Sequence, residues 1–371
     1  MFRCRRGDWR WRFVSEAAAE EAGDPTEMTG AEIVQECSDS RSTRCVFRRD
    51  GLYFKREIRL GSAFTVRAAA YLFPPAQAEF NSILLLKRVG IPVVEPVGCG
   101  SDGHASILIT REEAGAVSVQ KLLLRMEAAG ELPSDEFLVG WSKVTGALFR
   151  KRIYFPDFHS GNLLCRGASG GFVIVDPQGI RRSFVDHENR RLKMIRRQYG
   201  ECFGRLPKST VLKMLAVMLP EEDPEELYRR LLIHSAAYIR AHSLRKRRRL
   251  EGFRRGKFTR VIDGVECRLD AAGGPLSREG TEALSPAPER AAQLWERDWL
   301  FSLFRLPTLR IVGRDGKNGT LYRERAGAGE VTEAERRDLL ERVELAGFDP
   351  REFVCRRDRF GRARLEDLGS R

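Results

Sequence analysis

Three residues in the middle of the chain have the types and spacing that phosphoryl transfer requires. Asp157 and Asn162 form a D-x-x-x-x-N pattern in a polar, glycine-containing stretch, and Asp176 follows fourteen residues after Asn162. One carboxylate in such a loop can face an acceptor hydroxyl, while an amide oxygen and a second carboxylate provide the hard oxygen ligands that Mg²⁺ prefers. The pattern therefore indicates transfer of a phosphoryl group from a magnesium nucleotide.

A cation for the nucleotide phosphates is expected upstream of these residues. The sequence CVFRRDGLYFKRE places Asp50-Gly51 between two runs of aromatic and β-branched residues, which predicts a β-hairpin with Lys55 on its second strand. The next segment, AQAEFNSILLLKRVG, has helical periodicity and ends at Gly90. Glu79 lies on this predicted helix, where it can hold Lys55 against the phosphates, and Glu57 and Glu95 are alternatives for this role.

The later elements are predicted to present the two acids. The run GFVIVDPQG reads as a short buried strand that ends at Asp176, and reactive groups commonly lie at such strand ends. A helix capped by Ser134 should precede the Asp157 loop, because Asp135 and Glu136 suit its first turn. His159 lies inside the loop, where a contact with substrate or metal is the alternative to the loop-stabilising hydrogen bond that we expect.

The stretches KRE, AEFNSILLLKRVGIPVVEPVG, FPDFHSGNLL and VIVDPQG resemble the lipopolysaccharide kinase family, whose members phosphorylate heptose or Kdo sugars of the inner core. The resemblance covers about residues 38–260. It implies an α+β, bilobal protein-kinase-like fold with a small β-rich N-lobe and a mainly helical C-lobe. It also implies ATP and Mg²⁺ as cofactors and a lipid-linked sugar as the acceptor.

The resemblance implies a role for each candidate residue. Asp157 corresponds to the catalytic base, and Asn162 and Asp176 correspond to the metal ligands. Lys55 corresponds to the phosphate-binding lysine and Glu79 to its partner.

The chain also departs from protein kinases at three places. Phe155-Pro156 stands where protein kinases have His-Arg, and Pro177-Gln178 follows the metal-binding acid in place of Phe-Gly. No glycine-rich loop precedes Lys55, so Ser38 to Arg44 would have to cradle phosphates in another way. These departures keep a non-catalytic pseudokinase open as an alternative.

Composition changes suggest three regions, which are an N-terminal arm (1–34), a protein-kinase-like domain (35–260) and a C-terminal α/β extension of unknown role (261–371). Residues 244–260 hold nine basic side chains against one acid and mark the second boundary. Beyond it we expect an Asp-Gly hairpin in FTRVIDGVECRL, a linker from Ala271 to Pro288, a helix near Ala291 to Phe304 and a third hairpin.

The overall charge limits the partners. A net charge of +13 and a pI near 9.6 favour polyanions, and an anionic membrane surface is the partner we expect, with the basic run at 244–260 as a candidate contact. Nucleic acid is not expected, because no module that reads bases is recognisable. The N-terminus lacks the pattern of a secretory signal and no apolar span is present, so we expect a cytoplasmic protein, peripheral at the inner face of the bacterial inner membrane. The eight cysteines form no C-x-x-C pair, which favours isolated reduced thiols.

Two other functions remain open from sequence. A small-molecule kinase of the aminoglycoside or choline type has a similar loop, but such enzymes bind cationic acceptors in acidic pockets. A pseudokinase that binds polyanions would use the basic surface without catalysis.

Overall fold

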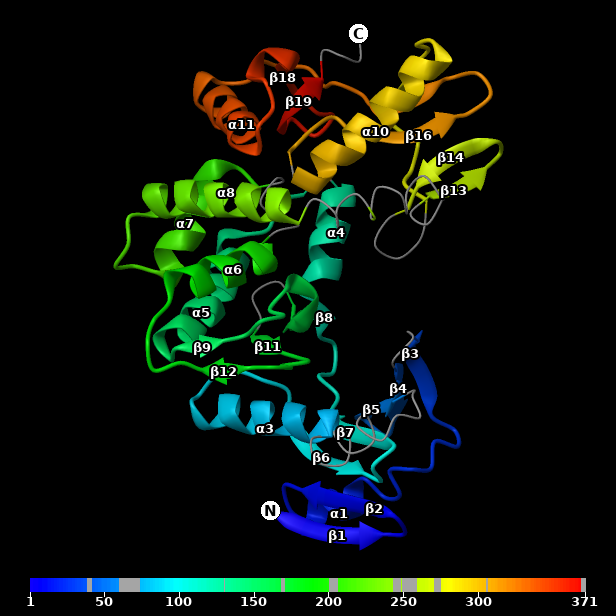
Figure 1. Cartoon of the computed structure of the whole chain (residues 1–371), viewed down its shortest axis with the longest axis vertical. Coiled ribbons are helices and arrows are strands. Elements are labelled where there is room, and N and C mark those ends of the chain that lie inside the picture. Colours follow the sequence, from blue (N-terminus) through cyan, green and yellow to red (C-terminus); the bar gives the residue numbers. More distant parts are fainter. Residues whose placement is uncertain are drawn as a thin grey trace. The chain divides into compact units, whose positions relative to one another are not determined.

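Strands dominate the first part of the chain and helices the part that follows (Figure 1). This mixture, with a β-rich N-terminal sheet, is as predicted. The computed structural model describes residues 1–38, 42–59, 74–129, 131–167, 171–199, 206–242, 248, 259–269, 275–304 and 306–367. The chain divides into unit 1, formed by Met1–Leu122 and Ser134–Arg197, and unit 2, formed by Leu123–Pro133 and Gln198–Arg371.

Unit 1 is built on a seven-stranded antiparallel sheet with the order β1-β2-β6-β7-β5-β4-β3. Its strands are β1 (Phe2–Arg6), β2 (Trp9–Phe13), β3 (Glu32–Ser38), β4 (Ser42–Arg49), β5 (Leu52–Arg59), β6 (Pro96–Ser101) and β7 (Ala105–Arg111). The predicted hairpin between β4 and β5 is confirmed. Its turn residues Asp50 and Gly51 both have positive φ, 51° and 73°, which Asp-Gly sequences adopt readily.

A helix covers each face of this sheet. On one face, α1 (Glu16–Glu21) begins at the cap residue Ser15 and packs its alanines on a core that includes Phe13 and Phe54. On the other face lies α3 (Pro75–Arg88), the helix predicted to carry Glu79. Figure 1 shows α3 running across β6 and β7. The core beneath α3 is formed by Ala76, Phe80, Ile83, Val94, Cys99, Leu108 and Val173.

The remainder of unit 1 carries short strands that fix the loops of interest. The predicted helix capped by Ser134 is α5 (Asp135–Arg150), which is followed by β9 (Ile153–Tyr154) and the 3-10 turn η1 (Ser160–Asn162). The other elements are β8 (Val117–Ser118), β10 (Leu163–Cys165), β11 (Phe172–Ile174) and β12 (Arg181–Arg182). Two helices, α4 (Val119–Ala129) and α6 (Glu188–Tyr199), begin in unit 1.

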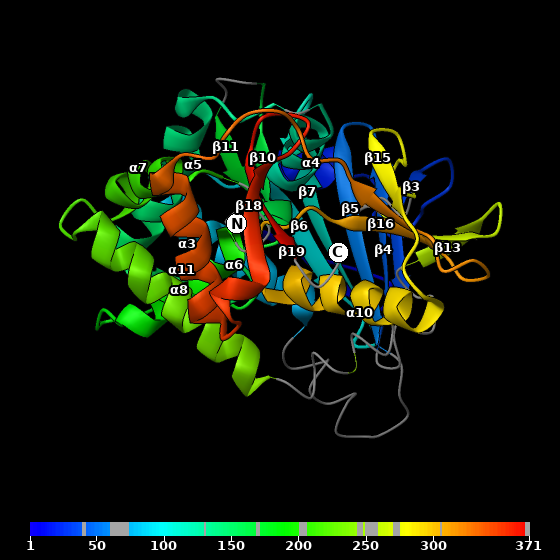
Figure 2. The ribbon, with the colours of Figure 1, turned by 90° about the horizontal axis from the view of Figure 1, so that it is seen from above.

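Unit 2 combines helices with a five-stranded sheet of order β13-β14-β16-β17-β15. Its elements are α7 (Lys208–Met218), α8 (Pro224–Ala241), β13 (Thr259–Ile262), β14 (Val265–Arg268), β15 (Thr281–Leu284), α10 (Pro288–Phe304), β16 (Ile311–Asp315), β17 (Leu321–Glu324), α11 (Glu333–Ala346), η2 (Pro350–Glu352), β18 (Phe353–Arg357) and β19 (Ala363–Asp367). Figure 2 shows α11 beside α8. The helix α10 packs on β16 of the five-stranded sheet.

The predictions for this region are mostly confirmed. Asp263-Gly264 forms the turn between β13 and β14, and the third hairpin is β16–β17 with a longer loop. The linker predicted from Ala271 to Pro288 is wrong in part, because Thr281–Leu284 pairs with β17 as an edge strand. Residues 271–274 lie outside the described residues, as does the basic run at 244–260 except for residues 248, 259 and 260.

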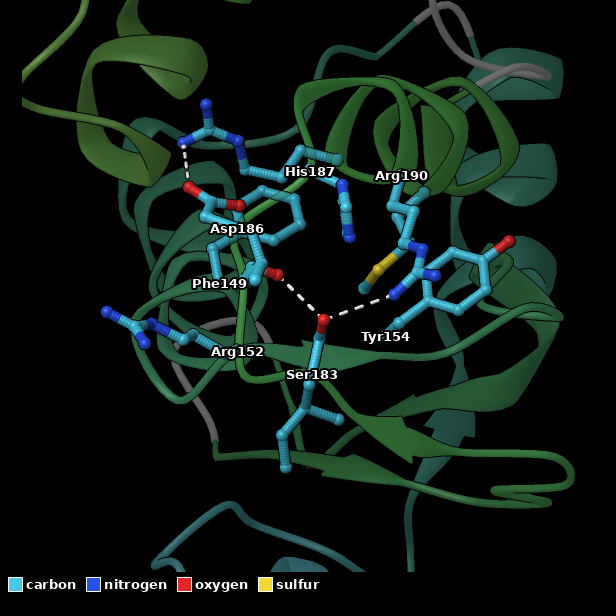
Figure 3. Close-up of a pocket in the computed structure, with 11 residues that line it drawn as sticks. Phe149, Arg152, Tyr154, Ser183, Asp186, His187 and Arg190 are labelled. Atoms are coloured by element: carbon cyan, nitrogen blue, oxygen red, sulfur yellow. Dashed lines mark hydrogen bonds and ion pairs between the residues drawn. The ribbon is translucent and has the colours of Figure 1, made fainter.

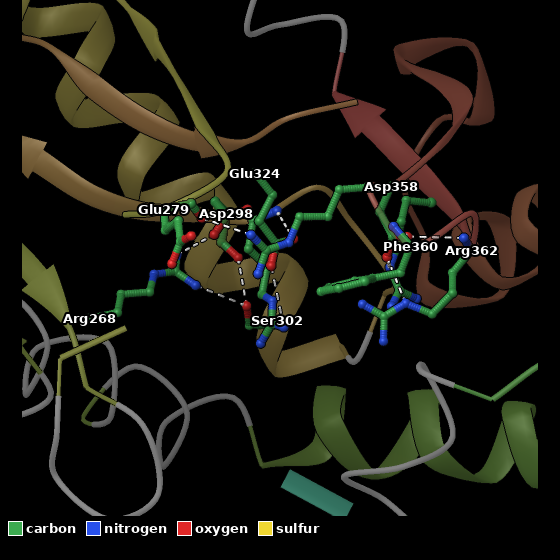
Figure 4. Close-up of polar contacts among 11 residues, drawn as sticks. Arg268, Glu279, Asp298, Ser302, Glu324, Asp358, Phe360 and Arg362 are labelled. Carbon is green, nitrogen blue, oxygen red and sulfur yellow. Dashed lines mark hydrogen bonds and ion pairs between the residues drawn. The ribbon is translucent and has the colours of Figure 1, made fainter. Parts of the chain in front are cut away.

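Charged side chains are buried inside unit 2 (Figure 4). Arg268 donates to the carboxylate of Asp298 and, over 3.3 Å, to the Ser302 hydroxyl, while its guanidinium lies 3.7 Å from the ring centroid of Trp299. Burial lowers the pKa of Arg268 and raises that of Asp298, so each charge depends on the other for stabilisation. This ion pair ties β14 to α10.

Two further observations concern membrane-spanning helices and cysteines in the described ranges. Within the described ranges, no helix has both the length and the apolar character needed to cross a membrane. Every cysteine in those ranges is a free thiol, and Cys202 lies outside them.

Candidate active site

The alternation of β5 sends Lys55 to the face of the sheet that α3 covers. Phe54 is fully buried in the core on the α1 side, so the next side chain along the strand must point the other way. Lys55 pairs across the ladder with Leu108, which belongs to the core under α3. The ammonium group of Lys55 therefore lies on the side of the sheet where Glu79 is found.

Glu79 lies on the buried face of α3. Ala76, Glu79, Phe80 and Ile83 recur at helical spacing and are all shielded from water. The Glu79 side chain is only 5% exposed, and its Oε2 atom lies 2.9 Å from the Nζ atom of Lys55. A buried carboxylate is costly unless it is paired, and the lysine provides that pairing.

Asp176 contacts the same lysine, although the two residues are 121 positions apart in the sequence. It follows β11, and its carboxylate accepts a hydrogen bond from the Nζ atom of Lys55. Its backbone has a φ of 51°, a conformation that few residues other than glycine adopt, and its carbonyl accepts from the backbone N–H of Gln178 at 2.7 Å. The side chain of Asp176 remains 38% exposed, so it can reach a ligand.

The pKa directions follow from this burial and pairing. Burial raises the pKa of Glu79 to about 7, although Lys55 opposes the rise. Burial alone would lower the pKa of Lys55, but the carboxylates of Glu79 and Asp176 outweigh it and raise the pKa above its ordinary value. Lys55 is therefore a fixed cation at neutral pH, which suits a phosphate partner.

The Asp157 loop is tied to the strand that leads to Asp176. The side-chain amide of Asn162 donates to the backbone carbonyl of Asp157 over 3.0 Å. The backbone carbonyl of Asn162 accepts from the N–H of Val175 over 3.0 Å, and the ladder continues with Leu163 opposite Ile174. Because Val175 directly precedes Asp176, these bonds hold Asn162 beside the second acid.

The predicted base has an exposed carboxylate. The Asp157 side chain is 58% exposed, and its Oδ1 atom lies 2.5 Å from Nη1 of Arg197 on α6. The ring of His159 accepts a hydrogen bond from the N–H of Gly161 over 3.1 Å, so the loop-stabilising role expected for His159 is confirmed. Lys55 thus contacts Glu79 and Asp176, and Asn162 is bonded to Asp157 and to Val175, the residue before Asp176. The catalytic roles of the five residues stay predictions.

Sequence reasoning missed two residues of this set. Gln178 donates to Oε2 of Glu79 over 3.1 Å, so the residue that replaces the glycine of protein kinases supports the partner of Lys55. Its place two positions after Asp176 was the available signal. Arg197 belongs to a run of basic residues on α6, and nothing local distinguished it.

Asn162 and Asp176 carry the kind of oxygen atoms that a magnesium ion prefers. The amide nitrogen of Asn162 is engaged with the carbonyl of Asp157, and the Oδ1 atom takes no part in that bond. Mg²⁺ commonly takes one or two protein oxygens and completes its shell with phosphates and water. Over the described part of the chain, no group of three or more His, Cys, Asp or Glu side chains could hold a metal by itself. Residues 39–41 of the expected phosphate cradle, Ser38 to Arg44, lie outside the described residues.

Comparison with known proteins gives structural matches alone. No family model matches the sequence, and no curated protein matches it. Among solved structures, the chain is similar to WaaP in complex with acyl carrier protein, with 15% sequence identity and a TM-score of 0.45, over 59% of this chain and 92% of that one. It is also similar to WbdD, with 15% identity and a TM-score of 0.37, over 52% of this chain and 42% of that one. At these values the matches carry no weight for function, which is inferred below from the contacts of the chain itself.

Proposed function

We propose that the chain is an ATP-dependent kinase that phosphorylates a sugar hydroxyl, of heptose or Kdo, in the inner core of lipopolysaccharide. One observation carries the proposal. The Nζ atom of Lys55 lies 2.9 Å from Glu79 and also contacts Asp176, whose strand is bonded to the Asn162 backbone. A cation held between a buried acid and an exposed acid has the arrangement that binds nucleotide phosphates beside a metal.

Lys55 would bind the nucleotide phosphates. Glu79 holds the ammonium from behind, and Gln178 donates to the Glu79 carboxylate and so supports it. Asp176 would leave its direct contact with Lys55 in favour of the metal, because its side chain is the more exposed of the two acids. Positioning of this kind is the main contribution that proteins make to phosphoryl transfer.

Asn162 and Asp176 would hold Mg²⁺, which neutralises negative charge on the phosphates when it is bound. Asp157 would accept the proton of the acceptor hydroxyl. One of its oxygens contacts Arg197, and the exposure of the side chain leaves the other oxygen available to the acceptor. Arg197 would orient this carboxylate and would add positive charge near the phosphoryl group during its transfer.

The architecture and the location belong to the same proposal. The sheet with α3 would be the small lobe, the segments from α5 onward would contribute the helical lobe, and residues 261–371 would be an extension. The acceptor class is supported by the resemblance of the sequence, and the net charge of +13 favours an anionic acceptor over the cationic acceptors of aminoglycoside or choline kinases. The enzyme would act at the cytoplasmic face of the inner membrane.

The proposal is tested by assay with ATP, Mg²⁺ and core lipid acceptors. Asp157→Ala is expected to lower kcat by about 10²- to 10⁴-fold, because proton removal from the hydroxyl loses its base. Asp8→Ala, at an exposed turn far along the sequence, is the matched control and should retain activity. Equal activity in wild type and Asp157→Ala would remove Asp157 from the mechanism.

A second measurement separates the alternatives. ATP with Mg²⁺ should raise the melting temperature of the wild-type chain and should raise that of Lys55→Met much less, because a ligand that binds only the native state stabilises it. No shift in the wild type would favour a non-catalytic binding protein. Turnover of cationic alcohols in preference to core lipids would favour the small-molecule kinase.

A further inference from the structure

A shallow hollow lined in part by arginines lies in unit 1 (Figure 3). Its walls come from the end of α5, from β9, from the segment after β12 and from the start of α6. The residues that matter for its chemistry are Arg152, Tyr154, Ser183, His187, Arg190 and Arg191. Nothing in the proposed phosphoryl transfer uses this hollow.

Among the residues that the structure describes, two of its arginines have no acidic partner. Arg191 lies 3.1 Å from the carboxylate of Asp186, which offsets its charge. Arg190 instead donates to the Ser183 hydroxyl over 3.2 Å and stacks 5.6 Å from the Tyr154 ring centroid, and Arg152 donates to the backbone carbonyl of Phe184. Within the described ranges neither Arg152 nor Arg190 forms an ion pair, so both charges are available to an anion.

The loop beside these arginines holds two apolar side chains out in water. Phe184 is 94% exposed and Val185 is 61% exposed. The loop is fixed by polar contacts, because Arg152 donates to the Phe184 carbonyl over 2.8 Å and the Ser183 hydroxyl donates to the Val185 carbonyl over 2.7 Å. Exposing apolar area in a fixed loop is unfavourable in water, which points to a nonaqueous partner.

The surrounding chain is strongly basic. Between positions 181 and 197 the acids are Asp186 and Glu188, and the bases are Arg181, Arg182, Arg190, Arg191, Lys193, Arg196 and Arg197. Arg181 and Arg182 are both exposed on β12. The apolar tip of the loop, formed by Phe184 and Val185, is therefore flanked by basic residues on both sides along the sequence.

The position of this surface relative to the predicted base is fixed by short connections. Tyr154 of the hollow precedes Asp157 by three residues, and Met194 of the hollow accepts the backbone N–H of Phe155 at 3.4 Å. One turn further along α6, Arg197 contacts Asp157. A molecule bound at the hollow is thus close to the exposed carboxylate.

We propose that Phe184, Val185, Arg152 and Arg190, with the flanking Arg181 and Arg182, form a docking surface for an anionic lipid bilayer. The apolar tip enters the interface between head groups and acyl chains, and the arginines bind lipid phosphates. A bilayer offers apolar and anionic chemistry at adjacent depths, which matches an apolar tip surrounded by cations. The proposal deepens the proposed function, because a lipid-linked acceptor would then be presented to Asp157 from the membrane surface.

The test is flotation of the full-length protein with vesicles of phosphatidylcholine alone or with phosphatidylglycerol, in the absence of nucleotide. Wild type should float with the anionic vesicles, less so as salt is raised. Phe184→Ser should weaken partitioning about tenfold, through loss of its apolar insertion. The double variant Arg152→Gln/Arg190→Gln should weaken it about fivefold for each charge removed.

Matched controls come from the same unit. Ile33→Ser removes another exposed apolar residue, and Arg88→Gln removes another exposed arginine. Both should float like wild type. Equal losses in controls and test variants, or no flotation of wild type with anionic vesicles, would overturn the docking surface, and the latter outcome would favour an acidic protein as the partner.

The docking surface and the kinase function can fail separately. Asp157→Ala should lose activity and still float, whereas Phe184→Ser should float poorly and still phosphorylate a detergent-dispersed acceptor. A chain that floats as described but never phosphorylates would refute the kinase and leave the docking surface standing. Unchanged melting of Phe184→Ser would show that its loss of flotation is not a folding defect.

Discussion

A single buried acid, Glu79, determines how the charges of the candidate site balance. In an unfolded chain its carboxyl group titrates near 4.5, whereas burial raises its pKa to about 7 in the folded chain. The folded chain therefore binds this proton more tightly than the unfolded chain does. The stability that Glu79 contributes through this proton is fully present below pH 4.5 and is lost as the pH rises through about 7.

We therefore expect the stability difference between wild type and Glu79→Gln to depend on pH. Glutamine has no proton to release, so the unfolding free energy of wild type should fall relative to that of Glu79→Gln between about pH 5 and about pH 8, by ~1 to 3 kcal/mol. Urea unfolding followed by circular dichroism at the two pH values measures this. Glu131→Gln, at an exposed loop position, is the control. A difference that stays constant with pH would show that Glu79 is ionised throughout the range.

Residue types and order were enough to predict which side chains meet at Lys55. Lys55 and Glu79 lie on neighbouring elements with clear periodicity, so alternation in the strand and helical spacing bring them to one layer. Gln178 could not be predicted, because it meets Glu79 across 99 positions of sequence and an amide has no specific pattern. Arg197 could not be predicted either, since long basic side chains on a helix have many partners within reach.

At the scale of elements, turns were predicted better than pairings. The Asp-Gly turns predicted the hairpins β4–β5 and β13–β14, because only a few residue pairs adopt two successive positive φ angles. The pairing of β2 with β6 was not predicted, since it joins strands separated by more than eighty residues. It depends on the glycines of β6, which leave room for the aromatic rings of β2.

Gly100→Ala tests this close approach. A Cβ atom at Gly100 would overlap the ring of Trp11, which is buried and stacked between Trp9 and Phe13. We expect a loss of about 1 to 3 kcal/mol of unfolding free energy, measured by urea unfolding with tryptophan fluorescence. Gly171→Ala is the control, because no heavy atom lies within 4 Å of a Cβ placed there. Equal stability of the two variants would mean that β2 moves away from β6 at little cost.

At the scale of the whole molecule, the sequence predicts a domain boundary near residue 260. Within unit 2, α8 packs on α11, and the buried hydroxyl of Tyr228 donates to Asp338 over 3.0 Å. The same Asp338 carboxylate lies 2.8 Å from Arg342, whose guanidinium is 5.7 Å from the Tyr228 ring centroid. A chain that ended at residue 260 would lose all of these partners of α8.

A fragment of residues 1–260 is therefore expected to melt at a lower temperature than the full chain, or to aggregate on expression. The physical reason is the uncovered apolar face of α8, together with a Tyr228 hydroxyl that loses its buried acceptor. Thermal unfolding of the two proteins measures this, and Tyr228→Phe in the full chain isolates the hydroxyl. A fragment as stable as the full chain would instead support an independent domain over 35–260.

The far edge of the seven-stranded sheet has a consequence for how the chain behaves at high concentration. β3 is the last strand, and its pairing with β4 is interrupted by a bulge between Ile33 and Gln35. Glu32 and Glu36 place negative charge along the same edge. A strand from a second copy would meet a kinked backbone and like charges, so this edge is a poor template for fibril growth despite the exposed Ile33 and Val34.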